Sequence, residues 1–209
     1  MTYGMTMRRT SSDAKREQLL AIASERFLAR GFAAVSVDEI VAAASQSKTN
    51  VYSWFGGKNG LFVATVDMLL NAMHDPLAGN EFASLPLKQG LRKLADTLLK
   101  IVLSRDALAL HRLIVAEAPA FPDIGRAWLA AGPQRTYSFC SAFIESHQKE
   151  GRLLNVDPRK ASIFFHDMLT GDVERRMLAG TLTSLRRADR DQLVDSCVDF
   201  FLRASEAER

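Results

Sequence analysis

The sequence predicts an all-α protein of about nine helices, divided into a small N-terminal unit and a larger helical body. Apolar residues recur at helical spacing along all 209 residues, and no stretch alternates as a half-buried strand would. Residues that start and end helices recur between the apolar stretches. The composition, 47% hydrophobic and 24% charged, is that of a globular chain long enough to bury a core.

Membrane and secretory signals are missing from the sequence. No apolar run approaches the roughly 18 residues needed to cross a bilayer, and no apolar stretch follows the N-terminal arginines as in a secretory signal. Cys140 and Cys197 are too far apart to suggest a disulfide framework, and they suit a reducing compartment. We therefore expect a cytoplasmic protein without a membrane partner. Both thiols are expected to be buried, with a redox switch as the alternative.

The N-terminal unit begins with a flexible arm at residues 1–11. The first helix follows capping residues at 11–13 and runs to about Arg30, where Gly31 ends it. The first predicted domain spans residues 12–72.

Two short helices and a longer one follow in this unit. Ser36 and Glu39 form a capping box that opens the first short helix. Ser47 is the expected N-cap of the second, which runs to about Phe55. A glycine pair separates it from a longer helix over 58–75, which a proline ends.

Five helical segments are predicted in the body, and it forms the second domain at residues 80–209. The segments are 86–104, 106–119, 122–150, 158–180 and 189–206. Asp157 with Pro158, and Asp189, supply the starts of the last two. Gly132 and Pro133 predict a kink in the long middle segment rather than its end.

Residues 35–55 form a helix-turn-helix pattern, in which the second of two short helices enters the major groove of DNA. Val51 and Phe55, four residues apart, are expected to pack on the first helix and to turn the other side chains outward. The predicted DNA contacts are Ser36, Gln46, Ser47, Lys48, Thr49, Asn50, Tyr52, Ser53, Trp54 and Lys58.

The residue types in this pattern suit double-stranded DNA. Lys48 can bind guanine acceptors, Asn50 can pair with adenine, and the Thr49 methyl group can contact thymine. Tyr52 and Lys58 suit phosphates, which set the register without choosing the sequence. The whole formal charge of +3 falls in residues 1–60, as expected if this part meets a polyanion.

Three stretches, FLARGF from Phe27, SVDEIV from Ser36 and VYSWFGGKNGLF from Val51, resemble the N-terminal domain of TetR-family transcriptional regulators. The resemblance covers about residues 12–72. It implies a sequence-specific DNA-binding regulator, and a repressor that binds a palindromic operator as a homodimer. An activator or dual regulator on the same fold is the alternative, as is a helical small-molecule binding protein or enzyme without DNA binding.

Two positions depart from the family pattern. The turn carries Ser45 and Gln46 where the family has glycine and an apolar residue, and Asn59 stands where an acidic residue is usual. A left-handed serine costs about 1 kcal/mol, which a serine can bear. Gln46 is then expected to be exposed and available to DNA.

The body resembles the C-terminal domain of the AefR-like branch over about residues 80–205, in the stretches from His111 and from Gly151. In TetR-like proteins the body holds an effector cavity, and here an apolar effector is expected to release the operator by shifting helix 58–75. The candidate pocket residues are His111, Arg112, Glu117, Phe121, Trp128, Phe139, Phe143, Phe164 and Met168. For each one, an ordinary core position is the alternative.

The last two helices are expected to pair with a twofold copy of the chain. The predicted dimer interface is Phe165, Leu169, Val194, Val198, Phe201 and Leu202. No glycine-rich phosphate loop or nucleophile elbow occurs, and the four histidines lack metal-ligand spacing. We therefore expect no catalytic residue, no metal and no cofactor.

Overall fold

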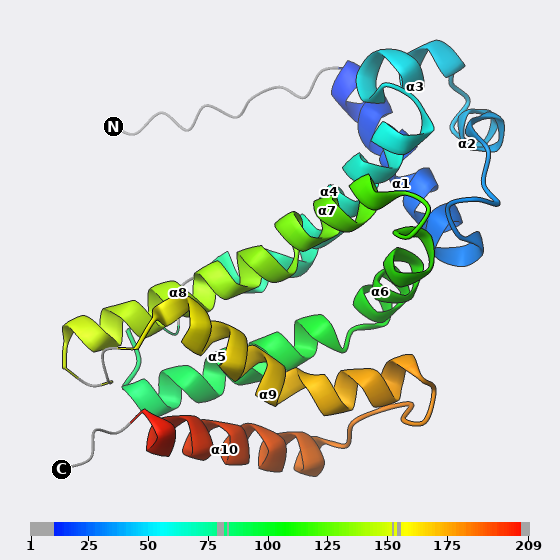
Figure 1. The fold of residues 1–209 in the computed structure, drawn as a ribbon. Coiled ribbons are helices and arrows are strands. Elements are labelled where there is room, and N and C mark those ends of the chain that lie inside the picture. The colour runs from blue at the N-terminus through cyan, green and yellow to red at the C-terminus, as the bar shows by residue number, and fades with distance from the viewer. Residues whose placement is uncertain (1–10, 79–81, 83, 152, 154–155, 206–209) are drawn as a thin grey trace, which may run out of the picture. The chain divides into compact units, whose positions relative to one another are not determined.

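The computed structural model describes residues 11–78, 82, 84–151, 153 and 156–205, and in this part of the chain it has ten helices and no strand (Figure 1). The helices are α1 (Ser11–Arg30), α2 (Val37–Ala43), α3 (Lys48–Phe55), α4 (Lys58–Ala78), α5 (Leu87–Val102), α6 (Arg105–Glu117), α7 (Pro122–Ala131), α8 (Pro133–Lys149), α9 (Pro158–Leu178) and α10 (Arg187–Ala204). The all-α fold class is confirmed. The predicted arm lies outside the described residues except for Ser11, which begins α1.

The tenth helix arises because Gly132 divides the segment that we expected to be one kinked helix. Pro133 begins α8, and a proline disfavours helical backbone at the residue before it. Gly132 accordingly has φ −103° and ψ −95°. Pro76, expected to end α4, lies within its last turn. Among the described residues, no helix combines the length and apolarity needed to span a bilayer.

The described chain forms two compact units. The first comprises Leu69 and the described residues before it, together with Leu113–Ala127. The second comprises Leu70–Arg112 and the described residues from Trp128 onward. The α4 and α6 helices therefore each contribute residues to both units.

The core of the first unit centres on three phenylalanine rings. Phe27 of α1 and Phe32 lie 4.9 Å and 5.1 Å from Phe62 of α4, between ring centroids, in edge-to-face geometry. All three side chains are at most 2% exposed. Each such pair contributes about 0.5–1.5 kcal/mol beyond burial. Between Phe27 and Phe32, Gly31 ends α1 as predicted, with φ +82°.

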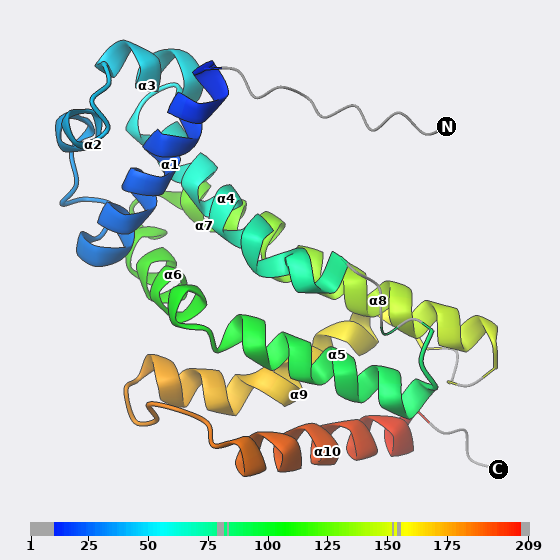
Figure 2. The same ribbon diagram turned by 180° about the vertical axis from the view of Figure 1, so that it is seen from behind.

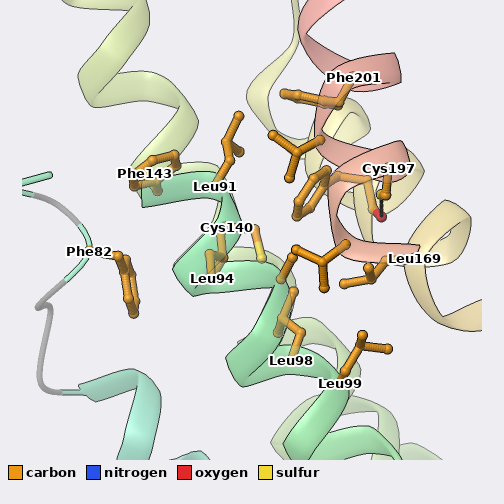
Figure 3. Packing of buried hydrophobic residues seen from close by; sticks show 14 of the residues in the cluster. Phe82, Leu91, Leu94, Leu98, Leu99, Cys140, Phe143, Leu169, Cys197 and Phe201 are labelled. Atoms are coloured by element: carbon orange, nitrogen blue, oxygen red, sulfur yellow. Dashed lines mark hydrogen bonds between the residues drawn. The ribbon is translucent and has the colours of Figure 1, made fainter. Parts of the chain in front are cut away.

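The core of the second unit is built on α5, which lies beside α9 and α10 in both views (Figures 1 and 2). Leu91, Leu94 and Leu98 of α5 are fully buried among residues of α8, α9 and α10 (Figure 3). Gly90 permits this packing, because a Cβ atom there would lie 2.7 Å from the Phe143 ring. Burial of one leucine side chain stabilises a fold by about 1.5–3 kcal/mol.

Both cysteines belong to this second core. Cys140 and Cys197 are free and at most 3% exposed, and Cys197 Sγ lies 3.9 Å from the Phe165 carbonyl oxygen (Figure 3). Burial raises the pKa of each thiol to about 12. Since the thiolate is the reactive form, the structure favours the buried-thiol interpretation over a redox switch.

The turn between α2 and α3 contains Ser45, which has φ +52°. It is the one non-glycine residue with positive φ in the described part of the chain. The Ser45 N–H donates to the Ala42 carbonyl, and the Gln46 N–H donates to the Val41 carbonyl at 2.9 Å. Serine thus occupies the left-handed position that the sequence departure predicted.

We expect Ser45→Gly to stabilise the protein by about 0.5–1 kcal/mol. The left-handed conformation costs a non-glycine residue roughly 1–2 kcal/mol, and glycine gives back about 0.5–1 kcal/mol in backbone entropy. Chemical unfolding followed by circular dichroism measures the difference. Ser45→Ala is the control, since alanine keeps the strain, and an equal gain in that variant would contradict the explanation.

Candidate nucleic-acid interface and ligand cavity

The two helix starts of the helix-turn-helix segment are capped by serines, as predicted. The Glu39 N–H donates to Ser36 Oγ at 3.2 Å, while the Ser36 N–H donates to Glu39 Oε2 at 3.1 Å. Ser47 Oγ accepts from the Asn50 N–H at 3.4 Å. The guanidinium of Arg30, 2.5 Å from Glu39 Oε1, helps to hold the pKa of Glu39 below its usual value. These bonds fix where α2 and α3 begin.

The inward face of α3 is anchored by Val51, which is fully buried. It faces the first unit's core together with Ile40 and Val41 of α2, which are also buried. Phe55 is half-buried, and the Arg16 guanidinium lies 5.1 Å from its ring centroid. Gly56 ends α3 in the left-handed conformation, with φ +73°. The predicted division of α3 into an inward and an outward face therefore matches the burial of Val51.

Six of the ten predicted DNA contacts are exposed: Ser36, Ser47, Lys48, Thr49, Tyr52 and Ser53. Tyr52 is 60% exposed. Lys48 Nζ lies 2.7 Å from Asp38 Oδ1, and this carboxylate raises the pKa of the lysine. Because both partners are largely exposed, the ion pair adds little stability and can give way to another acceptor.

The other four predicted contacts are half-buried and engaged within the unit. Gln46 Nε2 donates to the Lys15 carbonyl at 2.8 Å, and Gln46 Oε1 accepts from Asn50 Nδ2 at 3.1 Å. The Gln46 amide thus joins α1 to α3 instead of facing solvent as expected. Trp54 packs edge-to-face on Phe55.

Lys58 is directed inward, where a phosphate contact was expected. Its Nζ donates to the Ala33 carbonyl at 3.4 Å and lies 4.3 Å from the Phe32 ring centroid. Burial lowers the pKa of Lys58, which the Glu117 carboxylate partly offsets. A phosphate contact by Lys58 would require it to leave these partners.

Glu117, the last residue of α6, binds the turn that follows α1. Its Oε1 accepts from the Phe32 N–H at 2.9 Å and from the Ala33 N–H at 3.2 Å. Phe121 packs edge-to-face on Phe32, with ring centroids 4.7 Å apart. Glu117 and Phe121 were predicted as pocket residues, but the structure places both in the first unit. Nothing in the sequence around Glu117 indicates that its carboxylate accepts from amides more than eighty residues away.

The second unit contains a cavity of about 490 Å³. This lies within the range of about 300–1,000 Å³ typical of sites for small organic ligands. Its apolar wall comes from α4, α5 and α6, and includes Leu70, Met73, Ile101 and Leu110. Its polar wall comes mainly from α8 and α9. The titratable side chains on the cavity are His74, His111, Tyr137, His166, Asp167, Glu174 and Arg175.

Of the nine predicted pocket residues, His111 and Trp128 line this cavity. Phe143 belongs to the α5 core, and Phe139 packs against that core. Phe164 is 67% exposed and Met168 is 36% exposed. The remaining residue of the second unit, Arg112, donates to the Met177 and Leu178 carbonyls at the end of α9.

The residues predicted for the dimer interface lie inside the second unit instead. Five are at most 6% exposed and Leu202 packs against the same core; the five are Phe165, Leu169, Val194, Val198 and Phe201. Their neighbours Phe164 on α9 and Phe200 on α10 are 67% and 65% exposed. In the pairs Phe164–Phe165 and Phe200–Phe201, the second ring faces the core and the first is exposed. The outward face of each helix therefore lies one residue away from the predicted one.

Potential metal ligands are dispersed over the described part of the chain. Within the described ranges, no group of three His, Cys, Asp or Glu side chains comes together as a metal ion would require. The histidines of the cavity instead pair with one carboxylate or one hydroxyl each, as in His111 with Glu174 and His74 with Thr136.

A capped helix-turn-helix with a polar outer face, followed by a larger helical unit, is typical of DNA-binding regulators. The family model for the AefR-like transcriptional repressor C-terminal domain matches residues 89–206, and that for bacterial regulatory proteins of the tetR family matches residues 19–65. The first match covers more than half of the chain. The protein belongs to the TetR family of transcriptional regulators, whose members are not enzymes.

Individual relatives agree with this assignment. The chain is 29% identical over 149 residues to the transcriptional regulator RutR of Escherichia coli strain K12, covering 70% of this chain and 68% of RutR. It superposes with a TM-score of 0.85 on a TetR-family regulator from Mesorhizobium loti MAFF303099, at 26% identity, over 95% of this chain and 100% of that one. The flavonoid-responsive regulator FrrA gives a TM-score of 0.80 at 25% identity, over 94% of this chain and 99% of FrrA.

We expect Glu117→Ala to destabilise the first unit by about 1–3 kcal/mol, because the part-buried Phe32 amide and the exposed Ala33 amide lose their acceptor. Glu117→Gln retains an amide oxygen at the same place and should lose less than half as much. Denaturant unfolding measures both changes. Glu25→Ala, at an exposed position of α1, is the control and should stay within about 0.5 kcal/mol of the wild type. Equal stability of Glu117→Ala and Glu25→Ala would contradict the role of this carboxylate.

Proposed function

We propose that this protein is a homodimeric repressor that binds a palindromic operator and is released from it by a small-molecule effector. In this proposal residues 12–72 contain the DNA-binding surface, and residues 80–209 form the dimer and bind the effector together with Leu70, Met73 and His74 of α4. The regulator would act in the cytoplasm, where the bacterial chromosome lies. Its match to the AefR-like repressor domain supports the repressor role, and the flavonoid response of FrrA supports control by a small organic molecule.

One observation carries the proposal: α4 and α6 each contribute residues both to the cavity and to the unit that contains the helix-turn-helix. Leu70 and His74 of α4, and His111 of α6, line the cavity. The same α4 begins at Lys58, directly after the helix-turn-helix, and the same α6 ends at Glu117, which binds the turn after α1. A ligand in the cavity therefore contacts two continuous helices that also hold residues of the first unit.

The proposed mechanism is a two-state coupling through these helices. A shift of α4 or α6 on effector binding would move Lys58 or Glu117 and so reorient α3. The two recognition helices of a dimer must lie about 34–36 Å apart to match successive major grooves, and a change of this spacing loses the operator. The effector has to bind the DNA-incompetent state more tightly, since equal affinity for both states shifts nothing.

For DNA recognition we propose that Lys48, Thr49 and Ser53 face base edges, while Ser36 and Tyr52 contact phosphates. All five are exposed; Lys48 is held only by a solvent-exposed ion pair, whereas Ser36 would contact a phosphate while it still caps α2. Gln46, Ser47, Asn50, Trp54 and Lys58 complete the proposed set. Of these, the half-buried Gln46, Asn50, Trp54 and Lys58 would have to release the contacts they make in the first unit.

For the dimer we propose the outward faces of α9 and α10. Phe164, Met168 and Phe200 are the large apolar side chains exposed on these two helices. Exposed phenylalanines on adjacent helices are typical of a surface that pairs with another protein. A twofold contact is isologous, so each chain presents the same patch to its partner.

The DNA-binding proposal is tested by gel shift with the DNA upstream of the protein's own gene. We expect a palindromic fragment to be retained, and Lys48→Ala to cost about 1–3 kcal/mol on it while relaxing its sequence preference. Lys160→Ala removes the same charge from an exposed position of α9 and should leave the preference intact. If no fragment is retained at low salt, the proposal fails, and equal losses on cognate and random DNA would exclude Lys48 from base reading.

For the dimer proposal we expect Phe164→Glu and Phe200→Glu each to weaken self-association by at least about 2 kcal/mol, as expected for a buried aromatic anchor. Sedimentation equilibrium measures the dimer constant. Val115→Glu makes the same change at an exposed apolar residue of the first unit and should leave dimerisation unchanged. A wild-type monomer, or equal effects in all three variants, would contradict the interface.

A further inference from the structure

We propose that the effector is a neutral aromatic molecule that carries a hydroxyl group, and that Glu174 binds this hydroxyl. The inference rests on the proposed function, because it names the ligand class of the cavity assigned to the effector. Three features of the cavity carry it: paired aromatic rings, a wall of hydrogen-bond acceptors, and the placement of its charges.

Two aromatic pairs line the cavity. Trp128 of α7 lies against His111, with ring centroids 5.0 Å apart and planes at 37°. Tyr137 of α8 lies edge-to-face on His166 of α9, with centroids 5.2 Å apart. Flat ligands pack well on such faces, and aromatic contacts add to the burial of apolar area. With Leu70 and the other aliphatic residues opposite, the cavity suits a planar apolar body.

Three polar groups of the cavity, those of His74, Thr136 and Thr170, have donated their protons to partners inside the protein. His74 Nδ1 lies 2.6 Å from the Leu70 carbonyl, which can only accept, so this nitrogen carries the proton. Burial lowers the pKa of His74, and in the resulting neutral ring Nε2 accepts from the Thr136 hydroxyl at 2.9 Å. The Thr170 hydroxyl donates to the His166 carbonyl at 2.9 Å. Both threonine oxygens are thereby left as acceptors.

His111 and Glu174 form a hydrogen-bonded pair on the cavity. His111 Nδ1 lies 2.8 Å from Glu174 Oε1, and a carboxylate only accepts, so the imidazole donates. The second Glu174 oxygen remains an acceptor that a ligand in the cavity can use. A ligand group that meets the Glu174 and threonine oxygens must supply a donor. A hydroxyl group on the aromatic ring supplies one, whereas a ketone or an ether does not.

The charges of the cavity disfavour an anionic ligand. Glu174 and Asp167 both line it, and the Glu174 side chain is only 19% exposed. Arg175 is the opposing charge, but it is exposed and folds back over Gly171, where its Nη1 lies 3.5 Å from the position of a Cβ atom. Solvent screens the exposed Arg175 and Asp167 charges more than the charge of the half-buried Glu174 carboxylate, which therefore dominates the cavity.

The test uses three probes with the same two rings: para-hydroxybiphenyl, para-methylbiphenyl and para-carboxybiphenyl. Isothermal titration calorimetry on the full-length protein measures each dissociation constant. We expect the hydroxyl compound to bind about 10- to 100-fold more tightly than its methyl isostere, as a hydrogen bond to a charged group allows. The carboxylate should bind most weakly of the three.

Variants then locate the hydroxyl site. Glu174→Gln should reduce the preference for hydroxyl over methyl by about tenfold and leave the affinity for the methyl compound unchanged. Glu145→Gln makes the same substitution at an exposed position of α8 and should alter neither constant. Since the probe series is informative in the wild-type protein alone, the test remains decisive if Glu174→Gln is poorly folded.

Three results would overturn the inference: tighter binding of the carboxylate, which would indicate an anion paired with Arg175; equal binding of the hydroxyl and methyl compounds; or no binding of any probe. Gel shifts with and without para-hydroxybiphenyl separate this inference from the proposed function. Selective binding without loss of the retained DNA would support the ligand class and contradict effector release. Release of the DNA by para-carboxybiphenyl alone would support effector release and contradict the proposed ligand class.

Discussion

Burial of α5 is the constraint on which the second unit depends. Leu91, Leu94 and Leu98 lie on one face of this helix and are fully enclosed by α8, α9 and α10. Because this face is occupied along its whole length, the three surrounding helices have little freedom to shift. The end of the same helix places Ile101 on the cavity. The packing of α5 therefore stabilises the unit and also fixes one wall of the candidate ligand site.

In the first unit, capping and ring packing together decide which face of α3 is free. Ser36 and Ser47 set the starts of α2 and α3, and Val51 then turns α3 so that its polar side chains face outward. The Phe27, Phe32 and Phe62 rings hold the base of this segment. Glu117 adds acceptors for two amides of the turn after α1, a position that only a residue far along the chain could fill.

The cavity shows how hydrogen bonds within a protein can define the chemistry of its ligand. The carbonyl beside His74 and the carboxylate beside His111 each fix a ring proton on Nδ1. Once those protons and the threonine hydroxyls are committed, the Glu174 and threonine oxygens remain as acceptors on the cavity. Selectivity for a donor would then follow from bonds made before any ligand enters, since an unpaired acceptor in a buried site is costly.

Most of the local structure could be predicted from the sequence, because its signals act over a few residues. The capping box, the Ser47 N-cap, the glycine end of α1 and the left-handed Ser45 all follow from backbone bonds within one turn. Helical periodicity likewise predicted the segments, except that Gly132 and Pro133 end a helix where a kink was expected. The predicted outward position of Lys48 also needed only the 3.6-residue repeat.

The sequence by itself thus determined the all-α class, the helix-turn-helix and the family. Tertiary structure alone decided which residue of each adjacent phenylalanine pair enters the core, because neighbouring helix positions differ by about 100° and both are apolar. It also decided that Glu117 and Gln46 bind backbone groups of distant segments, and that two of the nine expected pocket residues reach the cavity. Those contacts join residues far apart in the chain, and no local pattern records which of them meet.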